Sequence, residues 1–430
     1  MAASPHRRRE FHQRTPKAIK REPSQPDGPR SIRSSWSVRG GRPFRPPGRV
    51  AGCLTAGGQD TDAGMMKLAL IRRQFSATGG AERYLQRLIE ALVEGGHEVH
   101  LFAETWPQEG GACVLHSIEA TGPRSLRPRR FAEAVRAAVQ PGEFDVVFSL
   151  ERTLRQDVYR AGDGVHATWL DQRRKFAPWW KKPWVGWGGF HRTMLQLERR
   201  TFDASNTRHI IVNSRMVGVD LAARFGFPDE RIHLVRNGVR TALLRAGKRA
   251  ETRRALGVSE TERCLLFAGS GWERKGLKFL LRAFAAWDRA DKRLIVAGKG
   301  NPPCPAPDRV LFTGPVASLA DLCAAADLFV FLPIYEPSAN VVIEALAAGL
   351  PVVTTSSNGA SELLEGGVFG EVIEDPSDTG AVVEVLRRWG DRARLAPAQV
   401  DSLKLDLERN VEETLAVLHL AAQERRGCPR

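Results

Sequence analysis

The sequence predicts an α/β protein made of two doubly wound domains. Short apolar runs alternate with helical patterns along most of the chain after residue 66, and this alternation is typical of parallel sheets covered by helices on both faces. The chain has 430 residues, too many for one ordinary domain. With 42% hydrophobic and 26% charged residues, it can form large cores, which excludes wholesale disorder.

The first α/β series begins at residue 67. Residues 67–73 read as a buried strand, and Leu85, Leu88 and Leu92 then recur at helical spacing up to the glycines at 95–96. Residues 98–102 read as the next strand, which completes a βαβ unit. Further strands are predicted at 145–150, 209–213 and 232–235, with helices at 127–139 and 215–225.

A second α/β series follows the segment Asn237-Gly238-Val239. Its predicted strands are 264–268, 293–297, 309–313, 328–334 and 351–354, and its predicted helices are 276–287, 318–326 and 339–348. We therefore expect one domain over 66–238, completed by a closing helix at 402–424, and a second over 239–401. Ligands of such sheets bind beyond the carboxyl ends of the strands, and two facing domains offer a cleft.

Residues 1–64 form a basic leader with a net charge of +8, rich in Pro, Gly and Ser. It has no central apolar run, so it is not a secretory signal. A disordered basic arm, a targeting peptide and an upstream stretch wrongly included in the reading frame are the three interpretations. The last is favoured, because Met65-Met66 directly precedes the first predicted strand.

Charge and cysteine usage narrow the class of protein further. The net charge of +15 favours anionic partners, namely nucleic acid, an acidic membrane surface or phosphorylated substrates. The six cysteines are scattered with no CxxC pair, a pattern that opposes a disulfide scaffold or zinc site and suits a reducing cytoplasm. No apolar run approaches the length of a membrane span.

The segment 327–351 carries the strongest functional signal. A buried strand leads through a loop containing Glu336 into a helix that begins near Ser338-Ala339-Asn340 and carries Glu344. Unpaired N–H groups at a helix start form a ready diphosphate site, and the two carboxylates are able to accept hydrogen bonds from sugar hydroxyls. The alternative is that both glutamates are ordinary helix charges.

Two other loops also follow predicted strands. Residues 269–276 place Ser270, Arg274 and Lys275 before a helix, where the cations are able to neutralise a diphosphate, although such a pair is also common surface decoration. Neither GxGxxG nor GxxxxGK[ST] occurs here. Gly79-Gly80-Ala81-Glu82 allows close approach of the backbone to a ligand, or is a plain tight turn.

These residues carry a family resemblance. From Met66 to about residue 425 the chain resembles family 4 glycosyltransferases of the GT-B fold, which are retaining enzymes that use nucleotide-sugar donors. The most specific motif is the pair Glu336/Glu344 followed by Ala-Leu-Ala-Ala-Gly-Leu-Pro-Val. Within the family, residues 157–163 and the basic segment after them resemble the lipopolysaccharide core glucosyltransferases, which add a hexose to inner-core heptose.

The resemblance implies roles for individual residues. Glu344 would bind the ribose and Glu336 the donor sugar, while Arg274 and Lys275 would stabilise the departing diphosphate. The resemblance also implies that the backbone N–H groups of Gly80, Ala339, Asn340 and Val341 would assist the diphosphate, with Gly79 and Ser270 beside the donor. Many family members have Arg where Ser270 stands, so Arg274 would cover that role. The donor implied is a UDP-sugar, with no cofactor and no metal.

Asp163 and His166 are candidates for contacting acceptor or donor sugar. Both are able to take part in proton transfer, since an imidazole titrates near neutrality. A turn-stabilising aspartate and a packed histidine are the alternatives. Asp60-Thr61-Asp62 resembles a metal-binding motif but lies in the leader, so we discount it.

An aromatic and basic segment follows. It contains Trp169 and, more tightly grouped, Trp179, Trp180, Lys181, Lys182, Trp184 and Trp187. Tryptophan beside lysine suits the headgroup region of an anionic membrane, where it would also meet a lipid-linked acceptor. A buried aromatic cluster and a nucleic-acid groove are the alternatives.

The sequence thus predicts a hexosyltransferase bound peripherally to the cytoplasmic face of the inner membrane, acting on a lipid-linked or lipopolysaccharide-core saccharide. A nucleotide-sugar epimerase of the same architecture and a non-catalytic basic binding protein are the rivals.

Overall fold

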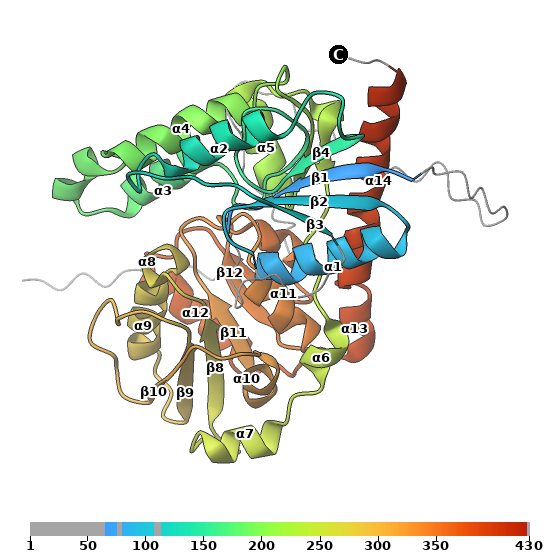
Figure 1. The fold of residues 1–430 in the computed structure, drawn as a ribbon. Coiled ribbons are helices and arrows are strands. Elements are labelled where there is room, and N and C mark those ends of the chain that lie inside the picture. Colours follow the sequence, from blue (N-terminus) through green and yellow to red (C-terminus); the bar gives the residue numbers. More distant parts are fainter. Residues whose placement is uncertain (1–64, 75–79, 107–112, 428–430) are drawn as a thin grey trace, which may run out of the picture. The chain divides into compact units, whose positions relative to one another are not determined.

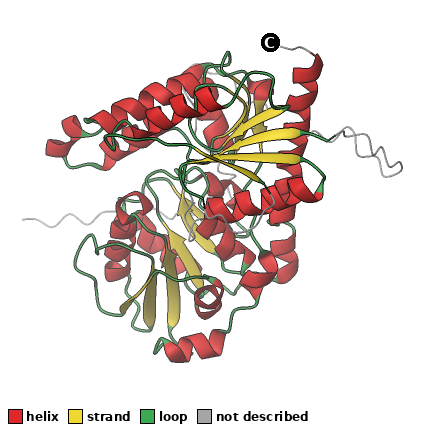
Figure 2. Cartoon of the chain, viewed as in Figure 1, coloured by secondary structure: helices red, strands yellow, loops and turns green. Residues whose placement is uncertain are grey.

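The computed structural model describes residues 65–74, 80–106 and 113–427. Their strands form two parallel sheets, as Figures 1 and 2 show. The first has seven strands in the order β3-β2-β1-β4-β5-β6-β7, with bounds β1 Lys67–Ile71, β2 Glu98–Ala103, β3 Val114–Ser117, β4 Val146–Ser149, β5 Gln156–Arg160, β6 Thr207–Val212 and β7 Ile232–Leu234. The second has six in the order β10-β9-β8-β11-β12-β13, with bounds β8 Arg263–Ala268, β9 Lys292–Ala297, β10 Val310–Gly314, β11 Leu328–Phe331, β12 Val352–Thr355 and β13 Gly370–Ile373.

The first sheet owes its core to the apolar stripe predicted for the first helix. In α1 (Gly80–Glu94), Leu85, Leu88 and Leu92 are fully buried against the sheet. The long helix α14 (Leu407–Gly427) adds Val411 and Leu418 to the same core and contacts β4, β5, β6 and α1 (Figure 1). The last helix of the chain therefore packs on the first sheet.

The second sheet is more uniformly apolar. Strand β11 consists of Leu-Phe-Val-Phe with every side chain buried, as expected for a strand covered on both faces. Around this sheet lie α9 (Leu277–Ala286), α10 (Ala320–Ala325), α11 (Asn340–Ala347) and α12 (Thr379–Trp389). The predicted α/β class with two parallel sheets is confirmed.

Several predicted bounds are wrong, each for a local reason. The strand predicted at 328–334 ends at Phe331, and Pro333 supplies no N–H to continue the ladder. The closing helix begins at Leu407 rather than 402, after Lys404 adopts a positive φ of 50°. The most polar strand, β5 (Gln-Asp-Val-Tyr-Arg), was not predicted as a strand, yet it is buried throughout.

The segment Asn237-Gly238-Val239 meets the start of α14. A Cβ atom on Gly238 would lie 2.4 Å from the carbonyl oxygen of Asp406, so only glycine fits there. Next to it, the Val239 N–H donates to the Leu405 carbonyl at 2.8 Å. The connection between the two sheets and the return of the chain into α14 are therefore in direct contact.

Candidate active site

A glycine places the two adjacent cations. Helix α8 (Trp272–Lys275) ends at Gly276, whose φ is 74°. A Cβ atom on Gly276 would lie 1.7 Å from the Leu332 carbonyl oxygen, so no other residue allows this approach. As a result, Arg274 and Lys275 lie beside the loop that follows β11, where the Ile334 N–H donates to the Arg274 carbonyl at 3.0 Å.

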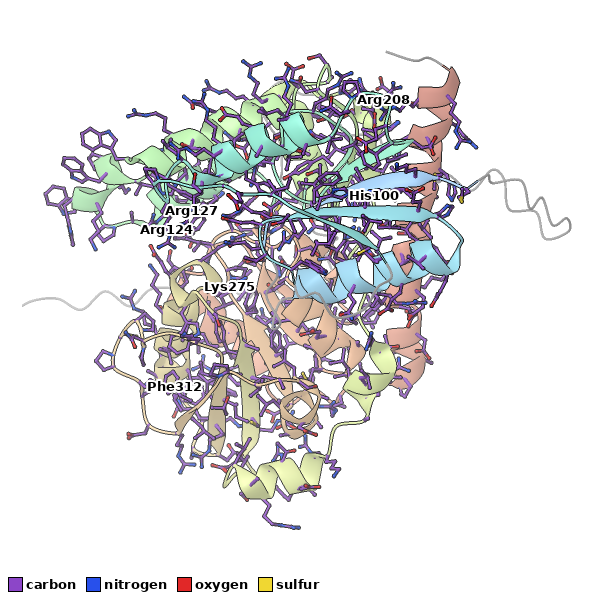
Figure 3. The ribbon with its side chains drawn as sticks, viewed as in Figure 1. His100, Arg124, Arg127, Arg208, Lys275 and Phe312 are labelled. Carbon is purple, nitrogen blue, oxygen red and sulfur yellow. The ribbon has the colours of Figure 1, made fainter. Side chains whose placement is uncertain are left out.

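The side chains of this loop and of α8 form an ion-pair cluster. The Lys275 Nζ lies 2.5 Å from Glu336 Oε2, and the Arg274 Nε lies 3.5 Å from the same oxygen. The glutamate side chain is 13% exposed, which strengthens these interactions relative to open solvent. One carboxylate between two cations leaves one positive charge in excess. This charge lies at the end of α8, where Figure 3 labels Lys275.

Arg274 is held by its inner nitrogen and its flat face. The Nε–H donates to the Tyr335 carbonyl at 2.9 Å. The guanidinium carbon lies 5.5 Å from the Trp169 ring and 5.7 Å from the Tyr335 ring, within cation–π range. Within the described ranges, no hydrogen bond occupies its two terminal amino groups, which remain available to an anion.

The start of α11 differs in part from the prediction. The Ala339 N–H, expected to assist a diphosphate, instead donates to Asn358 Oδ1 at 3.1 Å, so that assignment is corrected. The Asn340 and Val341 N–H groups have no acceptor in the described part of the chain. Two of the three expected donors at this helix start are therefore open.

Glu344 lies one turn beyond Asn340, on the same face of α11. Burial first, and then the negative charge of Glu344, raise the pKa of the Cys323 thiol, so the carboxylate lies near α10. This position does not contradict the ribose-binding role predicted for Glu344, which stays a prediction.

The loop containing Asp163 contacts the loop containing Glu336. The Val165 N–H donates to the Tyr335 hydroxyl at 2.8 Å. A Cβ atom on Gly164 would lie 2.4 Å from that hydroxyl, so this approach also requires glycine. Asp163 itself is exposed, one residue from this contact. The structure therefore brings two separately predicted segments together.

His166 does not titrate near neutrality, contrary to the prediction. Burial first, and then the charges of Arg152, His191 and Arg274, lower its pKa to about 4. Its Nε2 lies 3.0 Å from His191 Nδ1. The imidazole is therefore neutral at pH 7 and is able to accept or donate one hydrogen bond, but it is not poised for proton exchange there.

Ser270, Gly80 and Gly79 are the remaining residues predicted to bind the donor. Ser270 Oγ accepts a hydrogen bond from the Lys299 N–H at 3.0 Å and so ties together the loops after β8 and β9. Gly80 is the first residue of α1, while Gly79 lies outside the described residues.

Sequence reasoning missed the side chains that join these segments. Asn237 donates from Nδ2 to Asn340 Oδ1 at 2.7 Å and accepts from Arg160 at 3.0 Å. The Arg160 guanidinium in turn lies 4.1 Å from the Tyr84 ring. Asn237 stands in the segment that separates the two predicted domains, and Arg160 stands in the stretch 157–163 that carries the family resemblance, whereas nothing in the local sequence marks Tyr84.

The aromatic segment is a surface feature. The 3₁₀ helix η1 spans Trp179–Trp184, and exposed fractions in and after it are 79% for Trp179, 57% for Trp180, 62% for Trp184 and 76% for Trp187. Lys181 and Lys182 are also exposed, and buried Val185 anchors the segment. Core packing is therefore wrong for these four tryptophans, although Trp169 does pack against the second core. None of the helices described over 65–74, 80–106 and 113–427 has both the length and the apolar character to cross a bilayer.

Comparison with known proteins assigns the family. Residues 78–243 match the model described as Glycosyltransferase Family 4, and residues 262–389 match Glycosyl transferases group 1. Together these matches cover more than half of the chain. The chain belongs to the family 4 glycosyltransferases, and its two sheets form the GT-B fold.

Individual relatives agree with this assignment. The chain is 30% identical to D-inositol 3-phosphate glycosyltransferase 1 of Catenulispora acidiphila, over 51% of the chain and 59% of that protein. It is 24% identical to lipopolysaccharide glucosyltransferase WaaG of Escherichia coli, over 76% of the chain and 93% of that protein. The crystal structure of WaaG superposes with a TM-score of 0.68 at 22% identity, over 82% of the chain and 99% of that structure.

Proposed function

We propose that the protein transfers a hexose from a nucleotide-diphosphate sugar, a UDP-sugar by preference, to a lipid-linked or lipopolysaccharide-core saccharide with retention of anomeric configuration. The ion-pair cluster of Glu336 with Lys275 and Arg274 is the observation that carries the proposal. The similarity to WaaG, a lipopolysaccharide glucosyltransferase, supports the acceptor class.

The cluster suits a group that arrives and leaves as an anion. A bound diphosphate would compete with Glu336 for both cations, because phosphate and guanidinium form paired charge-assisted hydrogen bonds. Released from Lys275, the carboxylate would accept a hydrogen bond from a donor-sugar hydroxyl. The open Asn340 and Val341 N–H groups would then face the same diphosphate.

Charge development explains why these groups would accelerate transfer. As the glycosidic bond to the diphosphate breaks, negative charge accumulates on the leaving oxygen, and preorganised cations stabilise that state more than the ground state. His166, which is neutral, would form a hydrogen bond with a sugar hydroxyl. Asp163, which is exposed and close to it in the sequence, would contact the acceptor. The acceptor hydroxyl would attack the anomeric carbon from the face that the diphosphate leaves, and the leaving phosphate would receive the hydroxyl proton, so neither an enzyme nucleophile nor an enzyme base is required.

We propose that the exposed tryptophans and Lys181-Lys182 hold the protein at the cytoplasmic face of an anionic membrane, where a lipid-linked acceptor resides. Four exposed tryptophans are more than a monomer surface ordinarily carries in one segment, and such patches mark contact surfaces. Indole rings and lysine ammonium groups favour the bilayer interface. Nucleic acid remains the less favoured partner.

Glu336→Gln and Lys275→Ala test the enzymatic proposal. Loss of transition-state charge stabilisation is expected to lower kcat/KM for donor hydrolysis or transfer by about 100-fold or more in either variant. Lys299→Ala, an exposed lysine on the next loop, and Glu273→Gln are the charge-matched controls and should retain activity. Full activity of either site variant contradicts the proposal.

The products separate the proposal from its rivals. Incubation with several nucleotide sugars, followed by NMR of the product, should show nucleoside diphosphate release and an unchanged anomeric configuration. Inversion at C2 with the nucleotide sugar otherwise intact would instead identify an epimerase. If no donor is consumed and vesicle binding survives in Glu336→Gln, the chain is a non-catalytic binding protein.

A further inference from the structure

A cavity lies at the opposite end of the first sheet from the candidate active site. It has a volume of about 320 Å³ and is lined by α2 (Arg127–Ala138), the loop before β5 and the end of α14. Asp157, the second residue of β5, forms part of its wall. Arg160, three residues later at about 3.3 Å per residue, already belongs to the active-site end of the strand.

The charged lining of the cavity is strongly basic. It consists of one carboxylate, Asp157, and four guanidinium groups, those of Arg136, Arg155, Arg208 and Arg425. The carboxylate is already engaged, since Arg425 donates to Asp157 Oδ2 at 2.6 Å and Arg208 Nε lies 3.4 Å from Oδ1. Glu424, just outside the lining, also lies 4.0 Å from Arg208 Nη1, so two positive charges remain in excess.

Two of these cations lie at the open side of the cavity. Arg136 and Arg155 are exposed, and within the described part of the chain neither forms a hydrogen bond or an ion pair. Arg208, in contrast, is only 11% exposed at its side chain and forms the floor (labelled beside α14 in Figure 3). The arrangement combines a fixed, buried cation with two adaptable ones.

The rest of the wall is suited to an organic body. Apolar side chains of Val135, Val139 and Leu154 line the same space. A volume of this size lies at the lower end of the range for small-molecule sites, well above that needed for a bare phosphate ion. Guanidinium forks match phosphate oxygens, and the apolar wall matches the carbon face of a sugar or similar ring.

We infer that this cavity binds a phosphorylated small organic molecule, at a site separate from the one that holds the donor. The phosphate would contact Arg136 and Arg155, with Arg208 behind them. Because Arg425 belongs to α14, the ligand would also contact that helix. Asn410 of the same helix donates a hydrogen bond to the Arg236 carbonyl, in the link between the sheets.

Calorimetry on the full chain tests the inference, with glucose 6-phosphate and fructose 1,6-bisphosphate as probes and unphosphorylated glucose as the neutral match. Arg136→Gln/Arg155→Gln should weaken binding of at least one phosphorylated probe by about tenfold or more, since two charge-assisted hydrogen bonds are lost. The control Arg199→Gln/Arg200→Gln removes two exposed arginines of α4 (Gly189–Thr201) and should bind within about twofold of the unchanged chain.

Saturating UDP distinguishes the two sites. Retained probe binding in its presence supports the inference, whereas displacement by UDP assigns the probe to the donor site and overturns it. Equal affinity in both double variants, or no binding of either phosphorylated probe at millimolar concentration, also overturns it. If the first double variant instead loses binding to phosphatidylglycerol vesicles and keeps hexose phosphate binding, the cavity recognises a lipid headgroup and the inference fails.

Discussion

Strand β5 and the segment Trp179–Trp187 invert the usual relation between polarity and burial. Three of the five residues of β5 are Gln156, Asp157 and Arg160, yet all five are buried. The other segment carries four tryptophans and exposes at least 57% of each. The polarity of a side chain therefore does not determine its burial in either segment. Its burial depends on the partners available to it.

The partners of β5 lie within the fold. Asp157 accepts from the Val147 N–H at 3.0 Å and from Arg425, Gln156 donates to the Thr207 hydroxyl, and Arg160 donates to Asn237. Arg160 Nη1 is the one side-chain nitrogen of β5 that is buried without a hydrogen-bond partner in the described chain. Buried polar groups that have partners cost little, whereas removal of one partner leaves the other unpaired. The tryptophans have no such partners within the described chain beyond one another, as in the edge-to-face pair Trp184–Trp187 at 4.9 Å.

The largest expected effect on stability comes from removing a buried polar side chain of β5. Asp157→Ala leaves the buried Val147 N–H without its acceptor and removes the carboxylate that Arg208 and Arg425 share, so the free energy of unfolding should fall by about 3 kcal/mol. Trp179→Ala, which removes a far larger but exposed side chain, should change it by no more than about 0.5 kcal/mol. Urea denaturation of both variants measures the difference, and equal losses would contradict this account of β5.

A pH titration of stability should report on the buried side as well. Burial first, and then the charge of His209, lower the pKa of His233 to about 4, although Glu424 opposes this shift. The folded state thus holds a neutral imidazole that the unfolded chain protonates below pH 6.5. Stability from this residue is fully present above pH 6.5 and is lost as the pH falls towards 4, by up to about 3 kcal/mol.

His233→Gln is the matched variant for this titration, because glutamine retains hydrogen-bonding capacity without titrating. Its unfolding free energy, measured by denaturation between pH 7 and pH 4, should depend less steeply on pH than that of the unchanged chain. The same slope in both proteins would show that His233 is not neutral in the folded state.

Vesicle binding tests the role of the two lysines in the exposed segment Trp179–Trp187. Each lysine near an anionic surface contributes about 1 kcal/mol, so Lys181→Gln/Lys182→Gln should weaken binding to phosphatidylglycerol vesicles by about 30-fold at low salt. The difference should shrink as salt is added. Arg240→Gln/Lys299→Gln, which removes two exposed cations elsewhere, is the control, and salt-insensitive binding by the unchanged chain would rule out the polybasic explanation.

The smallest effect is expected for single tryptophans in the same assay. Trp180→Ala, which changes the least exposed of the four rings, should weaken vesicle binding less than Trp179→Ala does, because the more exposed ring has more surface to insert. Sedimentation with neutral and anionic vesicles would measure both, and the reverse order would indicate that Trp180 rather than Trp179 lies deeper in the bilayer interface.

Sequence patterns predicted the continuous apolar strands well, since β8, β9 and β11 are buried on both faces and contain little else. They missed β5, because its polar side chains find partners far away in the chain, such as Arg425. The juxtaposition of Lys275 with Glu336 followed from the placement of both after parallel strands. The engagement of the Ala339 N–H by Asn358 and the low pKa of His166 did not, because both depend on packing that no local pattern records.

Gly238 lies where the two chain passages between the sheets come into contact. The chain passes between the sheets twice, and the absence of a side chain at this position lets the outgoing and returning passages touch. A methyl group at this position would lie 2.4 Å from the Asp406 carbonyl oxygen and would force the two passages apart. Gly238→Ala should therefore disturb the link between the sheets, although residue 238 lies outside the ion-pair cluster of Glu336, Arg274 and Lys275.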